Sequence, residues 1–277
     1  MAFQFGICNE TFQDWPLEKS LAYAKEIGYT GWEIAPFMLG ADATSITSEQ
    51  RSDYRRTVEG AGFEVIGLHW LLAKTEGLHL TTEDSAVRHR TADYFNELVQ
   101  LCADLGGQVM VLGSPQQRNV PDGALMDVAY ENAAEVLRKV VPALETHGIK
   151  LALEPLGREE GNFMNTQALG RKLRDMIGSD HVGLHLDVKA MSDETEDIAG
   201  LIRENADLMM HFHANDPNRR GPGMGDVDFA PIFQALSDVD YQGWVSVEVF
   251  DYEPGIEALV GESMSNMRAS LPASDHR

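Results

Sequence analysis

Short apolar runs and amphipathic helical stretches alternate eight times along this chain of 277 residues. The apolar runs cover residues 3–8, 31–35, 64–69, 109–112, 150–154, 182–187, 209–213 and 245–249. Between them, apolar side chains recur with the period of a helix, as at Leu17, Leu21, Ala24 and Ile27. Strands that alternate with helices form parallel sheets, and eight such strands close into a barrel. The pattern therefore predicts a single (β/α)8 barrel domain over residues 1–277.

The competing architecture is an open doubly wound sheet, which shows the same alternation of strands and helices. Such sheets commonly bind nucleotides through a glycine-rich loop after the first strand. This chain has no G-x-G-x-x-G at that point and no G-x-x-x-x-G-K-[ST] motif. The closed barrel is therefore favoured.

The balance of charge excludes several classes of partner. The chain has 44 Asp and Glu against 22 Lys and Arg, a net charge of −22, which repels nucleic acids and anionic lipids. No apolar stretch approaches the length of a membrane-spanning helix. Two cysteines, Cys8 and Cys102, are too few for a disulfide framework and indicate reduced thiols. We therefore expect a cytoplasmic protein with a small-molecule partner, and no nucleic-acid or membrane role.

Four late runs end in a carboxylate or an imidazole that points to the same side. These residues are Glu154, Asp187, His213 and Glu248, and the alternation of strand side chains turns them all toward the barrel interior. Converging carboxylates without a cation would repel one another and become protonated. Three oxygen ligands and one nitrogen suit Mn²⁺ or Co²⁺ and tolerate Mg²⁺. Any one such carboxylate alone would more commonly cap a helix, but four together favour a metal site.

Other polar residues at strand ends have less specific signals. His185 and His211 lie one step deeper than the expected ligands, which is typical of hydrogen-bonded core histidines or of residues that support ligands. Glu33 and the pair His69 and Trp70 end the second and third runs, where they are candidates for substrate contact. Packing under the following long loop is the alternative for Trp70.

Several motifs of the second half resemble one enzyme superfamily. They are LALEP at 151–155, GNFMNT at 161–166, HLD at 185–187, HFHANDPNR at 211–219 and WVSVE at 244–248. In this order and spacing they resemble the xylose isomerase-like sugar isomerase/epimerase TIM barrels, and within them the D-tagatose/D-psicose 3-epimerase group. The resemblance covers residues 150–248, while the first half agrees only in layout.

The resemblance implies a reaction and roles for residues. It implies one divalent metal ion, Mn²⁺ first and Co²⁺ or Mg²⁺ next, held by Glu154, Asp187, His213 and Glu248. The two glutamates are the implied acid/base pair, and they abstract a proton next to the carbonyl of a ketose or oxo-sugar through a metal-stabilised enediolate. Arg219 and Glu160 match substrate-side positions of that family. From their places near the strand ends, Lys189, His69, Trp70 and His185 are further expected substrate-binding residues. Barrels of this family commonly pair, which implies a homodimer or homotetramer.

One departure from the resembled epimerases concerns the substrate. They have a substrate-contacting histidine three residues after the ligand aspartate, where this chain has Ala190. Lys189 either replaces the lost donor or is a loop charge. The departure indicates a substrate other than a free ketose held in the same manner, and it counts against the DNA-repair endonucleases of the superfamily. A lyase or dehydratase, an aldose–ketose isomerase and a non-catalytic sugar-binding barrel remain the alternatives to an epimerase.

Overall fold

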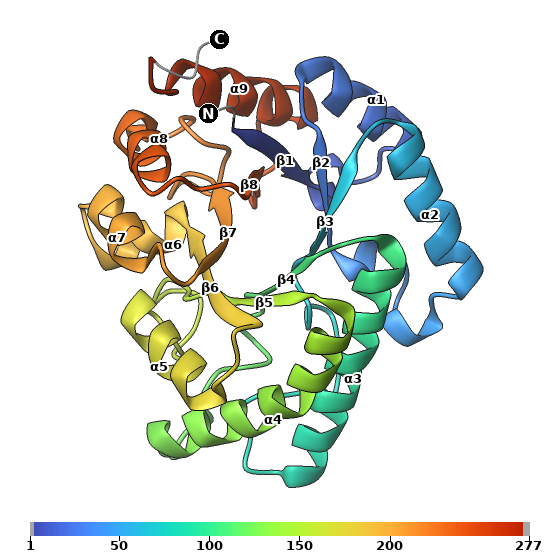
Figure 1. Cartoon of the computed structure of the whole chain (residues 1–277), viewed down its shortest axis with the longest axis vertical. Helices are drawn as coiled ribbons and strands as arrows, with labels where there is room; N and C mark the ends of the chain where they lie inside the picture. Colours follow the sequence, from blue (N-terminus) through green and yellow to red (C-terminus); the bar gives the residue numbers. More distant parts are fainter. Residues whose placement is uncertain (1–2, 274–277) are drawn as a thin grey trace.

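Eight parallel strands form a closed barrel in which each strand lies beside the next one in the chain. The computed structural model describes residues 3–273, and Figure 1 shows the strands at the centre of a ring of helices. The strands are β1 (Gln4–Cys8), β2 (Gly31–Ile34), β3 (Glu64–Leu68), β4 (Val109–Leu112), β5 (Lys150–Leu153), β6 (Val182–Asp187), β7 (Met209–Ala214) and β8 (Trp244–Val247). β8 pairs with β1 from Trp244 opposite Gln4 to Val247 opposite Ile7, which closes the sheet.

Nine helices follow the strands in the described part of the chain, and several of them begin or end at residues with typical capping chemistry. They are α1 (Leu17–Ile27), α2 (Ser48–Gly60), α3 (Ser85–Leu105), α4 (Met126–His147), α5 (Gln167–Ile177), α6 (Val188–Glu194), α7 (Ile198–Asn205), α8 (Phe229–Asp238) and α9 (Ile256–Ala269). Short 3-10 turns are η1 (Asn9–Phe12), η2 (Pro36–Met38) and η3 (Ala43–Ser45). Thr47 and Gln50 form a capping box at the start of α2. Gly106 ends α3 with φ 85°, a left-handed conformation that costs glycine little.

The apolar core consists of two separate clusters. The larger one lies between the strands and the surrounding helices, and the smaller one is formed by Ile66, Val109, Val111 and Ala152 with Met210 and Trp244. Val109 and Trp244 begin their strands, so the small cluster fills the N-terminal half of the barrel interior. The inward positions nearer the strand ends are left to polar side chains, and the active sites of such barrels form at this C-terminal end.

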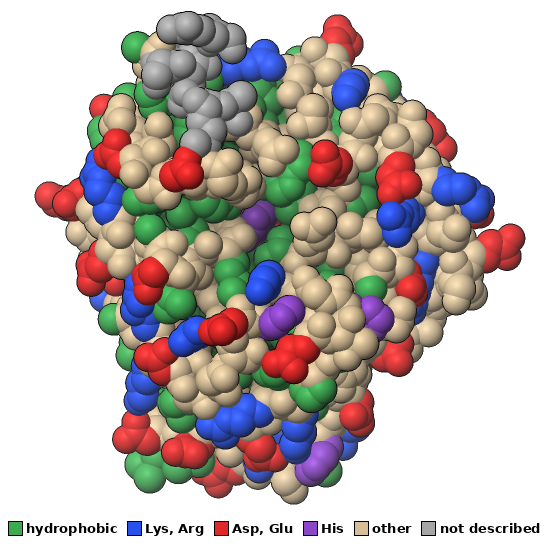
Figure 2. All heavy atoms as spheres, viewed as in Figure 1, with side chains coloured by type: hydrophobic (Ala, Val, Ile, Leu, Met, Phe, Trp, Pro, Cys, Tyr) green, Lys and Arg blue, Asp and Glu red, His purple; other side chains and the backbone are tan. Residues whose placement is uncertain are grey.

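The structure confirms the predicted barrel. Each predicted apolar run matches an observed strand to within two residues at either end. No helix within residues 3–273 is both long and apolar enough to span a membrane. Figure 2 shows acidic and basic side chains interspersed on the face that it presents.

Candidate functional site

Four buried side chains meet inside the C-terminal end of the barrel. Glu154 follows β5, while His185 and Asp187 lie on β6 and His213 lies on β7. One potential ligand atom from each of these residues lies within 4.8 Å of all the others. None of the four is more than 6% exposed, so their charges are shielded from water.

His213 lies between two carboxylates. Its Nε2 is 3.0 Å from Glu33 Oε1, and its Nδ1 is 3.0 Å from Glu248 Oε2. A neutral imidazole donates from only one of its nitrogens. Burial lowers the pKa of His213, but Glu33 and Glu248 outweigh it and hold that pKa well above the usual range. As an imidazolium, His213 can donate a hydrogen bond to each carboxylate. As a neutral ring it can donate to only one of them, and a metal cation at the other nitrogen would then balance the charge of the second carboxylate.

Glu33 decides which nitrogen of His213 stays available. Burial disfavours its charge, yet the adjacent His211 and His213 hold the pKa of Glu33 well below its usual range. Ionised Glu33 accepts the proton of His213 Nε2 and also contacts His211 Nε2 at 2.9 Å. The lone pair of Nδ1 then faces the strand ends, where Glu154, Asp187 and Glu248 also lie. A carboxylate that orients a ligand histidine in this way is common at metal sites.

Two further observations fit a cation at this place. Within the described residues, the Glu154 carboxylate makes no hydrogen bond, and burial together with Glu248 and Asp187 raises its pKa well above the usual range. Both ring nitrogens of buried His185 also lack a partner there. Buried polar atoms are rarely left unsatisfied, and a divalent cation among these groups would satisfy the carboxylates and relieve their repulsion.

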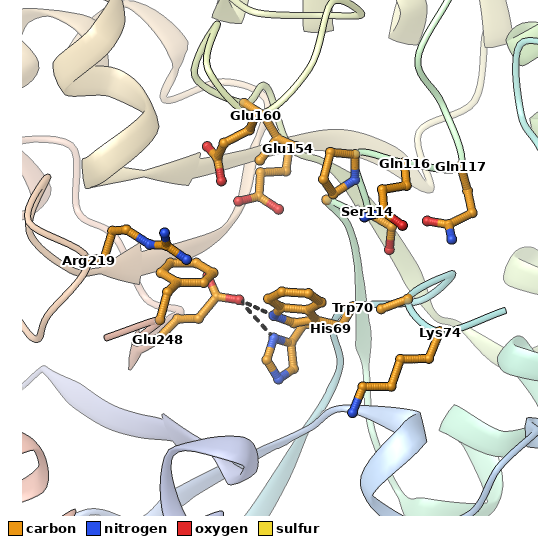
Figure 3. A pocket seen from close by; sticks show the side chains of 15 residues that line it. His69, Trp70, Lys74, Ser114, Gln116, Gln117, Glu154, Glu160, Arg219 and Glu248 are labelled. Carbon is orange, nitrogen blue, oxygen red and sulfur yellow. Dashed lines mark hydrogen bonds and ion pairs between the residues drawn. The ribbon is translucent and has the colours of Figure 1, made fainter. Parts of the chain in front are cut away.

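Glu248 is held by donors from the end of β3. Trp70 Nε1 donates to Glu248 Oε1 at 2.7 Å, and His69 Nδ1 lies 3.1 Å from the same oxygen, as the dashed lines of Figure 3 show. Burial would raise the pKa of Glu248, but His213 and His69 lower it below the usual range. Trp70 has φ 53°, a strained backbone conformation that is typical of functional sites.

Asp187 is fixed at both oxygens. Its Oδ1 accepts a hydrogen bond from the Ala190 amide at 2.8 Å, and its Oδ2 accepts one from Asn215 Nδ2 at 2.6 Å. Asp187 therefore caps α6 and points toward β7 at the same time. The remaining lone pairs of each oxygen are free to bind a cation.

A cavity of about 380 Å³ opens above Glu154 and Glu248. Its other lining residues are His69, Trp70, Ala73, Lys74, Gly113, Ser114, Pro115, Gln116, Gln117, Leu156, Glu160, Arg219 and Phe250. Figure 3 shows the Glu154 and Glu248 carboxylates directed into the same space from different strands. The aromatic rings of Trp70 and Phe250 lie 6.0 Å apart and form an apolar wall, which suits the face of a sugar ring.

Most of the predicted site residues lie around this cavity. Arg219 and Glu160 line it, and Lys189 Nζ contacts Glu160 Oε2 at 2.5 Å. The Arg219 side chain forms no hydrogen bond or ion pair with another described residue, so its guanidinium is available to a ligand.

Two of the predicted residues lie deeper in the barrel than the cavity. His185 and Glu33, both 0% exposed, lie beneath the cavity and are not among its lining residues. His185 is two residues deeper than Asp187 on the same face of β6, which places its ring against those of His211 and His213.

Asn215 and Phe250 are among the residues of the site that were not predicted from the sequence. Asn215 holds Asp187, and Phe250 lines the cavity. Each comes two residues after an expected ligand, His213 or Glu248. Extending the alternation of strand side chains by one step would therefore have found both.

We expect Glu33→Gln to weaken divalent metal binding by about 10–100-fold, the usual effect of removing a residue that orients a ligand. Glutamine keeps an acceptor for His213 Nε2 but loses the charge that selects this tautomer. The dissociation constant for Mn²⁺ would be measured by competition with a chromophoric chelator. Glu64→Gln, at the exposed start of β3, is the matched control. Unchanged affinity in Glu33→Gln would contradict this role.

Comparisons with known proteins agree with this architecture. A family model described as a xylose isomerase-like TIM barrel matches residues 21–270. The probable ketose 3-epimerase of Synechocystis sp. is 30% identical over 83% of this chain and 77% of its own length. The L-ribulose 3-epimerase of Mesorhizobium japonicum is 32% identical over 69% of this chain, but the match spans only 62% of that enzyme. The solved D-psicose 3-epimerase of Clostridium cellulolyticum superimposes with a TM-score of 0.84 at 20% identity, over 98% of this chain and 100% of that one, which shows a shared fold.

Proposed function

This chain belongs to the xylose isomerase-like TIM barrel family, and on that basis we propose that it is a divalent-metal-dependent sugar epimerase. Its substrate would be a ketose or an oxo-sugar, and the reaction would remove and return a proton on a carbon next to the carbonyl. The observation that carries this proposal is the pair Glu154 and Glu248, two buried carboxylates that face one cavity. The curated relatives reported above are named as sugar 3-epimerases.

The environments of the two carboxylates support an acid/base pair. The pKa of Glu154 is raised by burial and by neighbouring carboxylates, while that of Glu248 is lowered by its histidine neighbours. Carboxyl groups whose pKa values are pushed apart commonly divide the roles of acid and base. In one direction Glu248 would take the proton from the sugar carbon, and Glu154 would deliver one to the opposite face. In the reverse direction the roles exchange.

We propose Glu154, Asp187, His213 and Glu248 as the residues that hold the metal, with Mn²⁺ as the preferred ion. When bound, the ion would supply the positive charge that acidifies the C–H bond next to the carbonyl. Arg219 and Glu160 would position the sugar hydroxyls, and Trp70 would support the ring. Trp70 and His69 also hold Glu248 in the direction of the substrate. We also propose a cytoplasmic location; a homodimer or homotetramer stays a prediction.

The experiment that tests the proposal is turnover in D₂O, followed by NMR. With Mn²⁺-loaded protein and a panel of ketoses and 3-oxo-glycosides, we expect an epimeric product that carries one deuterium at the inverted carbon. Chelator-treated protein is the control and should show neither product nor exchange. A fully active, metal-free protein would contradict the role of the ion.

The same experiment distinguishes an epimerase from a lyase, which is the second candidate function. The observation that favours it is Ala190, which stands where the resembled epimerases have a substrate-contacting histidine and which donates only its backbone amide to Asp187. A lyase would begin with the same proton abstraction but would then protonate a leaving oxygen. Release of an alcohol or water together with an unsaturated product would overturn epimerisation.

A further inference from the structure

A second cavity of about 460 Å³ adjoins the one above the carboxylates. The two cavities share Glu160 and Arg219 in their walls. The other lining residues of the second cavity are Gly157, Glu159, Lys189, Ser192, Asp193 and Pro217. They come from the loop after β5, from α6 and from the long loop after β7, so this cavity also lies at the C-terminal end of the barrel.

Lys189 lies at the boundary between the two cavities. Its Nζ contacts Glu160 Oε2 and lies 4.9 Å from the centre of the Phe250 ring, and both of these residues line the first cavity. Its backbone amide donates to Asn215 Oδ1 at 2.9 Å, which fixes the first turn of α6. The ion pair between Lys189 and Glu160 therefore lies where the walls of the two cavities meet.

The walls of the two cavities differ in chemistry. The first has the apolar surfaces of Trp70, Leu156 and Phe250 close to the two carboxylates. The second has carboxylate, ammonium and hydroxyl groups from Glu159, Lys189 and Ser192. Groups of this kind form hydrogen bonds with sugar hydroxyls, and they make few favourable contacts with a flat apolar group.

We propose that the second cavity is a subsite for a second sugar unit, so that the substrate is an oxidised disaccharide. The oxidised ring would lie above Glu154 and Glu248, and the linked sugar would pass Glu160 and Arg219. Each cavity by itself has the size of an ordinary ligand site, about 300–1,000 Å³, so together they accept a ligand of two units. This inference rests on the proposed epimerase function and specifies its substrate class.

The test compares two substrates that differ only in the second sugar. Methyl 3-oxo-α-D-glucoside and 3-oxo-maltose carry the same oxidised ring, linked to a methyl group or to glucose. We expect kcat/KM to be at least about tenfold higher for 3-oxo-maltose, which corresponds to about 1.4 kcal/mol of additional transition-state binding. Proton exchange in D₂O would be followed by NMR for both substrates and for D-psicose.

A variant locates the effect in the second cavity. Ser192→Trp places a bulky ring in this cavity and should bring the ratio of the two kcat/KM values close to one. The Ser192 hydroxyl bonds only the Val188 carbonyl of its own helix, so folding should tolerate the change, and thermal melting would verify this. Ser52→Trp, exposed on α2, is the control and should keep the wild-type ratio.

The outcomes separate the two proposals. Exchange on D-psicose or on the methyl glycoside, with a wild-type ratio of one or less, would overturn the subsite and leave the epimerase function intact. A wild-type ratio that survives in correctly folded Ser192→Trp would also overturn the subsite. Absence of exchange on every substrate would overturn the epimerase function and the subsite with it.

Discussion

Glu248→Gln should lower kcat by about 10²–10⁴-fold, the usual contribution of a general acid or base, and should weaken Mn²⁺ binding as well. The amide has the size of the carboxylate and keeps an oxygen acceptor for Trp70 Nε1, so the site geometry should survive. What it loses is the charge that faces His213 Nδ1 and the ability to accept a proton. The measurements are kcat and KM by NMR, and metal content per chain.

Glu154→Gln is the complementary variant, because it removes the other carboxylate of the proposed acid/base pair. Because each carboxylate serves one face of the sugar carbon, each variant should keep proton exchange with only one of the two epimers. The control is Glu253→Gln, which alters an exposed carboxylate that pairs with Arg220. Turnover of the Glu248→Gln variant at the wild-type rate would remove Glu248 from the mechanism.

Gly113→Ala should also nearly abolish turnover, although it adds only one methyl group. Gly113 follows β4, and a Cβ atom at this position would lie 1.7 Å from Glu154 Oε2. The Glu154 carboxylate would have to swing away from its place in the cavity. Misplacement of a reacting group by roughly 1 Å costs about 10²-fold in rate, so we expect a loss in kcat of at least that size.

The fold should tolerate Gly113→Ala, because the three nearest atoms that the new methyl group would meet all belong to the carboxyl end of one side chain. Melting temperature would therefore stay near that of the wild type while kcat falls. Gly60→Ala is the control, since a Cβ atom at Gly60 would meet no atom within 4 Å. Wild-type kcat in Gly113→Ala would show that Glu154 does not need its observed position.

The architecture could be predicted because its signals are local. A strand of four to six residues and a helix of a few turns can each be recognised from the period at which their apolar residues recur. The two longest loops of the described chain, at residues 69–84 and 215–228, lie between such segments. For the same reason the alternation within each strand places Glu154, Asp187, His213 and Glu248 in the barrel interior.

The partners of these residues could not be predicted in the same way. Glu33 contacts His213 across 180 residues of sequence, and His69 contacts Glu248 across 179. Such contacts depend on the closure of the barrel, on the stagger between strands and on the rotamers chosen inside it. No local pattern distinguishes Glu33, which supports a histidine below the cavity, from a carboxylate that contacts a substrate.

The strands, the helices and the set of inward-facing polar side chains can be read from the amino-acid sequence, since these depend on periodicity within a few residues. Which of these side chains come into contact depends on the tertiary structure. It brought Glu33 under His213, paired Lys189 with Glu160 and placed a second cavity beside the first. These contacts cannot be predicted from local patterns, because the loops after β5 and β7 have no periodicity of their own. Their positions depend on tertiary contacts, such as the ion pair between Arg158 and Asp193 of α6.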